Sequence, residues 1–243
     1  RGMNLKEEDV VEKLFIASTL SHLLVFTSLG KVHWLRVFAI PDASRIAKGK
    51  SIANLLNLQS GESIASILSV RKFEKDKFVM VATERGVVKK TSLMAYSKPR
   101  QGGVIGLTID DGDRLIGAEL CDGESDILLA TAKGFSIRFS EKEARPIGRT
   151  GRGVRGIRLK AEDLVVGAEI VHPGNMLLTV TSNGYGKRTQ LEEYPVQGRG
   201  GLGVMTIRCN EKIGTVVGIQ QVTESDELLV ITSDGNIVRM KVN

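Results

Sequence analysis

One short sequence pattern occurs five times along the chain, and it constrains the fold more than any other feature. Each copy has two or three apolar residues, a Thr, two further residues and a Gly, and the five turn glycines are Gly30, Gly86, Gly134, Gly184 and Gly235. Consecutive turn glycines are 56, 48, 50 and 51 residues apart. A period near fifty residues is typical of a protein built from repeated small β modules.

Each copy of the pattern predicts a β-hairpin, because β-branched residues flank a turn whose Gly can take positive φ. A second, glycine-rich element follows the first four turns, with Gly49, Gly103, Gly153 and Gly203 standing 19, 17, 19 and 19 residues after the turn Gly. A polar turn and an apolar strand then close the unit. Each unit therefore offers about four short strands, and we expect an all-β fold that forms one domain over residues 1–243.

Helical patterns are sparse. They are limited to the charged start, from Leu5 to Phe15, and to a turn over residues 140–144, where Ser140 stands three residues before Glu143 as in a capping box. The sequence has no run of eighteen apolar residues, and its first residues do not have the pattern of a signal peptide. We expect a soluble cytoplasmic protein with no membrane partner.

The sequence offers no pattern for catalysis, a cofactor or a metal. Cys121 and Cys209 stand 88 residues apart and form no CxxC pair, so reduced, buried thiols are expected. His22, His33 and His172 have no spacing typical of metal ligands. An independent enzyme would need titratable residues that converge on one pocket, and these histidines have no partner pattern.

Charge is segregated by position within the repeat. The chain has a net charge of +6, but residues 31–50, 85–100, 133–160 and 184–208 hold 23 of its 34 Lys and Arg and only 5 of its 28 acids. These stretches sum to +18 and the remainder to −12. Stacked units place the same phase on the same side, which predicts one basic track suited to a polyanion. Ordinary solvated charges, the alternative, would mix both signs within each phase.

The glycine-rich elements favour nucleic acid as the polyanion, because Gly lets backbone N–H groups approach phosphate and Arg neutralises it. Aromatic residues make up 5% of the chain, which leaves few platforms for stacking single-stranded bases. We therefore predict double-stranded DNA that is held by its backbone and bent. The residues assigned to DNA binding are Arg45, Lys48, Lys50, Lys89, Lys90, Arg100, Arg138, Arg149, Arg152, Arg155, Lys187, Arg188, Arg199 and Arg239.

Two subsets of these bases carry sharper expectations. Arg149, Arg152 and Arg155 flank glycines at three-residue spacing and are expected to cradle phosphate; the alternative is that one or two of them pair with Glu141 or Glu143 and serve folding. The bases that follow a turn Gly by three or four residues are expected on the outer perimeter of consecutive units: Lys89, Lys90, Arg138, Lys187, Arg188 and Arg239.

Several longer motifs resemble the C-terminal domain of the DNA gyrase A subunit, which is a six-bladed β-pinwheel of four-stranded antiparallel blades that wraps DNA. The resemblance rests on Pro41-Asp42-Ala43-Ser44-Arg45 with Lys48-Gly49-Lys50, on Gly151-Arg152-Gly153-Val154-Arg155-Gly156-Ile157-Arg158-Leu159, and on Thr181-Ser182-Asn183-Gly184-Tyr185-Gly186-Lys187-Arg188-Thr189 with Glu193-Tyr194-Pro195. The A subunit of topoisomerase IV has a similar but more degenerate domain and is the alternative within the family. The five hairpins favour gyrase.

The chain departs from the family pattern at its two ends. The family's first blade carries a Gln-basic-Gly-Gly-basic-Gly box, of which Arg1-Gly2 matches only the tail, and the segment from Gln197 to Gly203 is a degenerate copy. We therefore expect hairpins two to six, with part of the first blade missing, and weaker DNA binding than an intact domain gives. The usual final glycine box and acidic tail are also missing from the sequence.

The resemblance implies a non-catalytic role within a larger enzyme. The domain would hold DNA on its outer rim and present a segment to the type IIA topoisomerase core, so that gyrase introduces negative supercoils. ATP and Mg²⁺ would belong to the full assembly, and no cofactor to this domain. The implied partners are gyrase B and the rest of gyrase A in an A2B2 heterotetramer in the bacterial cytoplasm at the nucleoid, with the isolated domain a monomer. A propeller-like protein-interaction scaffold remains the other alternative, and its binding would depend little on salt.

Overall fold

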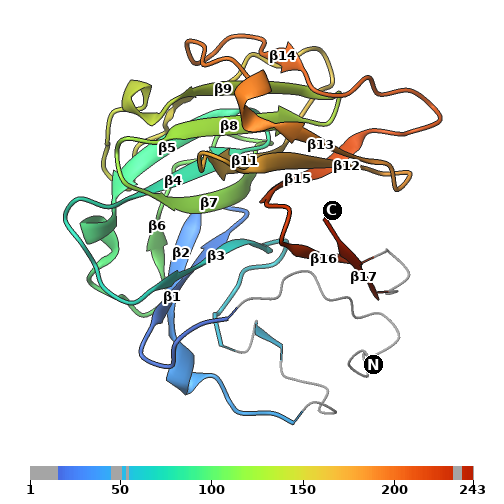
Figure 1. The fold of residues 1–243 in the computed structure, drawn as a ribbon. Helices are drawn as coiled ribbons and strands as arrows, with labels where there is room; N and C mark the ends of the chain where they lie inside the picture. The colour runs from blue at the N-terminus through green and yellow to red at the C-terminus, as the bar shows by residue number, and fades with distance from the viewer. Residues whose placement is uncertain (1–15, 45–50, 53–54, 232–236, 243) are drawn as a thin grey trace.

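Antiparallel hairpins form the frame of the fold in the computed structural model, which describes residues 16–44, 51–52, 55–231 and 237–242 (Figure 1). The described residues contain no α-helix, and none of their short 3-10 helices is long and apolar enough to cross a membrane. The hairpins are β1 (His22–Thr27) with β2 (Lys31–Arg36), β4 (Phe78–Thr83) with β5 (Val87–Ser92), β8 (Asp126–Thr131) with β9 (Phe135–Ser140), β12 (Met176–Thr181) with β13 (Gly186–Gln190), and β16 (Glu227–Ile231) with β17 (Ile237–Lys241).

The repeated Thr and Gly of each pattern build the hairpin turn. Gly30 has a φ of 77°, and its N–H donates to the carbonyl of Thr27 at 2.9 Å. The Thr27 hydroxyl accepts the N–H of Lys31 at 3.3 Å, and the turns at Gly86 and Gly134 repeat this arrangement. The predicted positive φ of the turn Gly is thus confirmed in the first four hairpins, including Gly184 at 79°, whereas Gly235 lies outside the described residues.

Four strands line the centre of the molecule. These inner strands are β3 (Ile64–Val70), β7 (Leu115–Cys121), β11 (Val165–Ile170) and β15 (Val216–Val222). Each pairs with the first strand of a hairpin, and the inner strands of successive units pack beside one another, β3 with β7, β7 with β11 and β11 with β15. Main-chain hydrogen bonds also join the units, since Leu115 donates to the carbonyl of Ser28 at 3.0 Å and Val165 donates to that of Glu84 at 2.8 Å.

The outer strand of each blade comes from the following unit. The short strands β6 (Val104–Ile105), β10 (Val154–Arg155) and β14 (Val204–Met205) pair with β2, β5 and β9. The sheets are therefore β3-β1-β2-β6, β7-β4-β5-β10 and β11-β8-β9-β14, followed by β15-β12-β13 and β16-β17 among the described residues. The second, third and fourth units each supply four strands, as expected, but the third strand of each unit pairs with the hairpin of the preceding unit, so blades exchange a strand between neighbours.

The core lies between successive sheets. Phe26 and Val81 are buried with Tyr96, whose ring meets that of Phe26 edge to face at 5.8 Å between centroids. Tyr96 ends the 3-10 turn η3 (Leu93–Tyr96), and similar turns follow β2, β9 and β13 as η1 (Val37–Ala39), η4 (Glu141–Glu143) and η5 (Leu191–Glu193). Ser140 caps η4 as expected, although its hydroxyl accepts from the N–H of Lys142. The predicted helical segment from Leu5 to Phe15 lies outside the described residues.

Candidate nucleic-acid interface

The glycine-rich elements form the outer edge of the blades, which makes them the natural centre of the predicted basic track. We call residues 100–106 box A, 148–156 box B and 198–206 box C; they contain β6, β10 and β14. The strand β14 lies at the outer edge of the molecule, whereas β11 and β15 lie toward its middle (Figure 1). Successive boxes therefore lie on one rim.

The box glycines allow each box to lie flat on the preceding hairpin. A Cβ at Gly153, where φ is 91°, would stand 2.6 Å from the Val88 carbonyl, and a Cβ at Gly203 would stand 2.3 Å from that of Ser136. Several box amides are already used within the protein: Gly106 donates to Gly30, and Gly156 donates to Gly86, each at 2.8 Å. These glycines thus serve strand packing, and the amides of Gly106 and Gly156 are not free to bind a ligand.

Two of the predicted contact residues are buried. Lys89 is 1% exposed, and its ammonium group donates to the carbonyl of Gly148 at 3.2 Å and to the carbonyls of Gly106 and Arg149. Lys90 is 3% exposed and donates to the carbonyl of Glu141 at 2.7 Å. The prediction that these lysines lie exposed on the rim is wrong, because protein oxygens surround both ammonium groups.

Burial also changes the acidity of Lys89. It lowers the pKa of this lysine to about 8, with the positive charge of Arg149 as the second cause. The three carbonyl dipoles favour the protonated form, so the group stays charged at neutral pH. Lys89 is therefore a buried cation held by main-chain oxygens.

Arg138 ties two units together instead of projecting from the rim. Its Nε lies 2.8 Å from the Asp126 carboxylate, and its Nη1 donates to the carbonyl of Leu191 at 2.9 Å. Trp34 holds the same position in its hairpin and donates to the carbonyl of Tyr96 at 2.8 Å. Lys90, the fourth residue after Gly86, binds the carbonyl of Glu141 in the same way. In three successive hairpins, the fourth residue after the turn Gly therefore donates to a main-chain carbonyl in the 3-10 turn of the next unit.

The last two hairpins present their bases to solvent, as predicted. Lys187 and Arg188 are exposed on β13, although the Lys187 ammonium also donates to the carbonyl of Thr206 at 3.0 Å. Arg239 is exposed on β17, where its Nε donates to the Glu227 carboxylate at 2.8 Å. Of the six perimeter bases, these three are exposed, Arg138 is partly buried, and Lys89 and Lys90 are buried.

Box B has the predicted cluster, with mixed exposure. Arg152 and Arg155 are exposed and Arg149 is partly buried. Arg152 pairs with Asp110 at 2.9 Å, in an ion pair whose side chains are 73% and 59% exposed. The acids that we had named as alternative partners have other contacts, since the Glu141 carboxylate lies beside Lys90 and the Glu143 carboxylate accepts the main-chain N–H of Arg199. The Arg199 guanidinium donates to the main-chain carbonyl of Glu143.

Box A and box C add further bases. Arg100 is exposed in box A, and Arg199 in box C donates to the Arg155 carbonyl at 2.9 Å, which links box C to box B. The predicted residues Arg45, Lys48 and Lys50 lie outside the described residues. The structure therefore brings Arg199 and Arg155 together and leaves Arg100 in the loop before β6, the outer strand of the first blade.

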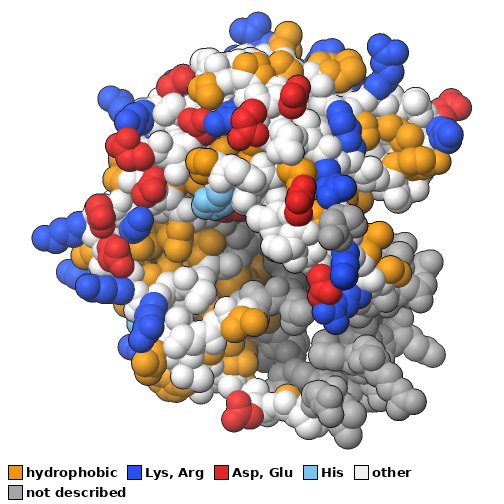
Figure 2. All heavy atoms as spheres, viewed as in Figure 1, with side chains coloured by type: hydrophobic (Ala, Val, Ile, Leu, Met, Phe, Trp, Pro, Cys, Tyr) orange, Lys and Arg blue, Asp and Glu red, His pale blue; other side chains and the backbone are white. Residues whose placement is uncertain are grey.

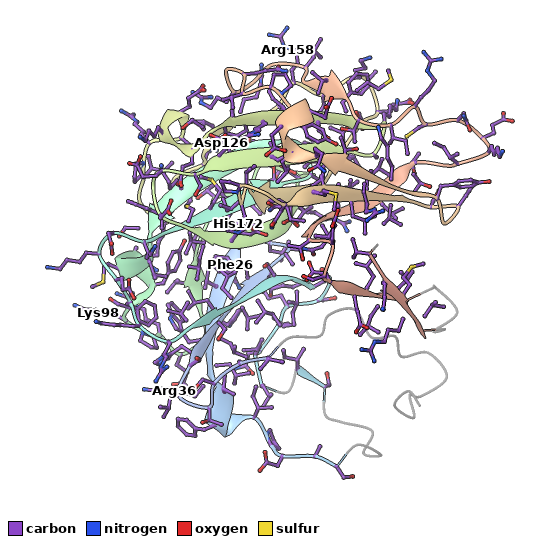
Figure 3. All side chains as sticks on the ribbon, viewed as in Figure 1. Phe26, Arg36, Lys98, Asp126, Arg158 and His172 are labelled. Atoms are coloured by element: carbon purple, nitrogen blue, oxygen red, sulfur yellow. The ribbon has the colours of Figure 1, made fainter. Side chains whose placement is uncertain are left out.

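Further exposed Lys and Arg residues, which the sequence analysis did not assign to DNA binding, also lie on the outer surface of the blades. Arg36, Lys98 and Arg158 project from the outer outline, away from the central Phe26 (Figure 3), and Lys and Arg side chains stand out along the upper and left-hand outline of the space-filling view (Figure 2). Arg145 and Arg208 are exposed as well. All five fall within the basic stretches, so the charge segregation was the pattern that could have identified them.

Two partly buried acids, Glu119 and Glu169, lie on the inner strands β7 and β11, far from the boxes in the sheet order. The Ile170 amide donates to the Glu119 carboxylate at 2.9 Å, across the junction of β7 and β11. Burial, and then the neighbouring carboxylate of Glu169, raises the pKa of Glu119 to about 7. Gln221 donates to Glu169 at 3.1 Å, so an acidic and amide network follows the centre of the molecule.

A family model agrees with the repeat seen in the structure. The model of the DNA gyrase C-terminal domain, a β-propeller, matches residues 21–71, 77–122, 125–172, 175–223 and 226–243. Each matched segment begins at or just before one of the five hairpins. The expected all-β propeller class is thus confirmed, and the described residues contain five of its units.

Curated relatives point to the same group. The DNA gyrase A subunit of Salmonella typhimurium is 44% identical over 239 residues, which cover 98% of this chain and 27% of that protein. The DNA gyrase A subunit of Clostridium acetobutylicum is 41% identical over 243 residues, which cover 100% of this chain and 29% of that protein. The chain thus spans less than a third of the length of these relatives.

Solved structures share the arrangement of blades. The C-terminal domain of DNA topoisomerase IV is similar with a TM-score of 0.83 and 27% identity, over 92% of this chain and 70% of that one. The DNA gyrase A C-terminal domain is similar with a TM-score of 0.81 and 25% identity, over 98% of this chain and 81% of that one. The repeat, the exchanged outer strands and these matches agree, and the chain belongs to the family of DNA gyrase C-terminal domains.

Proposed function

We propose that this chain binds double-stranded DNA through its phosphates along the rim formed by boxes A, B and C, and bends the duplex as it does so. The observation that carries the proposal is the repetition of the boxes, because they form the outermost strands of three successive blades and carry the exposed bases Arg100, Arg152 and Arg155. A duplex that touches one blade can reach the next by curving. Each added phosphate contact then offsets part of the bending energy.

Only some of the bases that the sequence analysis assigned to DNA binding are exposed enough to contact DNA. Lys89 and Lys90 support the rim from within, Arg138 is held by Asp126 and the Leu191 carbonyl, and Arg239 lies on β17, outside the boxes and β13. The contacts are therefore assigned to exposed or partly exposed bases of the boxes and of β13, together with Arg45, Lys48 and Lys50. The box and β13 residues are Arg100, Arg149, Arg152, Arg155, Arg199, Lys187 and Arg188.

Within a gyrase, the bound segment would serve the strand-passage reaction of other parts of the enzyme. We propose that the chain works with gyrase B and with the rest of gyrase A in an A2B2 assembly, in the bacterial cytoplasm at the nucleoid. That assembly would introduce negative supercoils with ATP. This chain would contribute DNA geometry and no catalytic group, with ATP and Mg²⁺ bound elsewhere in the assembly, and would be a monomer in isolation.

Salt dependence tests the proposal. We expect the logarithm of the affinity for linear duplex DNA to fall linearly with the logarithm of the salt concentration, because phosphate contacts release counterions. Duplexes of unrelated sequence should bind with similar affinity, since backbone contacts carry little sequence information. Dye labels at the two ends of the duplex should approach each other on binding. Affinity that does not change with salt would instead favour a protein-interaction scaffold.

A further inference from the structure

Lys89 lies where two successive boxes meet, far from solvent. Its ammonium group binds the carbonyl of Gly106 in box A and the carbonyls of Gly148 and Arg149 in box B. Burying a cation is costly unless its donors are satisfied. Here the acceptors are main-chain oxygens of box A and box B. The ammonium group therefore holds the backbones of the two boxes at fixed positions relative to each other.

The contacts fall at the start of the arginine loop of box B. Just before the box, the Ile147 amide donates to the Lys90 carbonyl at 2.9 Å, and at its far end Val154 pairs with Val88. Between these points the backbone leaves β5, and the Thr108 hydroxyl holds its middle by donating to the Thr150 carbonyl at 2.7 Å. Lys89 therefore fixes the segment from which the arginines of box B project.

We propose that Lys89 is a positioning residue for DNA binding, which holds box B so that Arg149, Arg152 and Arg155 meet phosphates together. This inference rests on the proposed function. Lys89 would not touch DNA itself, because it is 1% exposed. The positive charge of Arg149 lowers the pKa of Lys89, whereas the carbonyl of the same residue accepts from the ammonium group, so attraction to the backbone offsets the repulsion between the two cations.

The chain itself shows what other residues do at this position. Ile137 stands at the equivalent place three residues after Gly134, where box C is held instead by the hydrogen bond from Thr206 to Ser136 at 2.6 Å. Lys187 stands at the equivalent place after Gly184, is exposed, and binds the Thr206 carbonyl at 3.0 Å. The fold thus accepts Ile here, and Lys187 offers a matched cation.

The test compares Lys89→Ile with Lys187→Ile, which remove the same charge from the same place in the repeat. For each we would measure the salt dependence of duplex DNA affinity and, without DNA, the rate of trypsin cleavage after the three arginines of box B. We expect Lys89→Ile to lower the salt slope by more than one and up to about three, one for each arginine of the loop. Cleavage in box B should be roughly tenfold faster, because local opening exposes the loop.

Lys187→Ile should lower the salt slope by about one at most and leave cleavage in box B as in the wild type. Lys89→Ile with an unchanged salt slope, or with unchanged cleavage, overturns the positioning role even if the melting temperature falls. If Lys89→Ile does not fold, Lys89→Met, which keeps an unbranched stem, is judged by the same two readouts. Wild-type binding that does not depend on salt overturns the proposed function, whereas cleavage still decides whether Lys89 holds box B, so the two failures are distinguishable.

Discussion

The ammonium group of Lys90 donates to the main-chain carbonyl of Glu141 at 2.7 Å and lies 3.4 Å from the carboxylate of the same residue. The side chains are 4% and 0% exposed, so this is a buried ion pair between the second and third units. The Glu141 carboxylate also accepts the amides of Gly123 and Ser125, each at 2.9 Å. The side chain of Glu141, which belongs to η4, thus connects that turn to β5 and to the loop before β8.

We expect Lys90→Met to destabilise the domain by about 3–5 kcal/mol, because it leaves the Glu141 carboxylate buried without its cation. Adding Glu141→Gln should restore part of the loss, since a neutral amide still accepts the two main-chain N–H groups. Urea unfolding would measure both effects. Lys142→Met, which breaks an exposed pair with Glu124 at 2.6 Å, is the control and should leave the unfolding midpoint unchanged.

The docking of box C on β9 should depend on Gly203. Its φ is 74°, and a Cβ there would stand 2.3 Å from the Ser136 carbonyl, so Gly203→Ala should cost about 2–4 kcal/mol in unfolding free energy. Gly198→Ala, in the same box, is the matched control, because a Cβ there meets nothing within 4 Å. Equal unfolding midpoints for the two variants would mean that box C is not packed as described.

Glu119 should make the stability of the domain depend on pH. Its pKa of about 7 in the folded protein lies above the value of about 4.3 for an unfolded Glu, so folding favours the protonated carboxyl. The resulting stabilisation is fully present below about pH 4 and is lost as the pH rises through 7. Glu119→Gln should therefore match the wild type near pH 4 and exceed its unfolding free energy by up to about 3 kcal/mol at pH 8.

Urea titrations at several pH values would measure this difference between Glu119→Gln and the wild type. The exposed Glu224→Gln serves as the control and should show no such trend. A difference between Glu119→Gln and the wild type that stays constant from pH 5 to pH 8 would contradict the assignment.

The arginines of box B should act on DNA and not on folding. We expect the triple variant Arg149→Ala, Arg152→Ala and Arg155→Ala to keep its melting temperature, because the Arg152 pair with Asp110 is exposed and the Arg149 carbonyl that binds Lys89 remains. The salt slope of DNA affinity should fall by up to about three, and the DNA should bend less.

The control for this prediction removes three exposed bases from the loop between β3 and β4, through Arg71→Ala, Lys72→Ala and Lys75→Ala. It should keep nearly the wild-type slope. Equal losses in both triple variants would show that binding is spread over the whole surface, and a lower melting temperature with unchanged affinity would show that the box B arginines are structural.

Much of the fold could be predicted from the sequence, because local chemistry determines it. The Thr and Gly of each turn hydrogen-bond within a few residues, so the hairpins can be recognised without knowledge of the rest of the chain. The strand exchange could not be predicted in this way. Strands of two residues, such as β6, carry too little pattern to identify their partner, which is set by contacts such as that between Gly106 and Gly30.

The sequence could locate the boxes but not decide which of the candidate bases are exposed. The spacing of the glycines identified the boxes, whereas the burial of Lys89 depends on carbonyls 17 and 59 residues away in the chain. One local pattern indicated that Lys89 and Lys90 could not both be exposed on the rim. Neighbouring residues of a strand face opposite sides, so Lys89 and Lys90, placed between Val88 and Thr91 within β5, could not both project from the same face.

The exchanged outer strand also bears on how such a chain can change its number of repeats. A duplicated segment of about fifty residues does not add a self-contained blade, since its box must fit the hairpin before it and its own hairpin must accept the box that follows. A chain with an added repeat can therefore fold only if the new box fits the preceding hairpin and the new hairpin fits the following box. A substitution in one box, such as one at Gly203 beside the Ser136 carbonyl, would therefore also change how the hairpin of the neighbouring unit is covered.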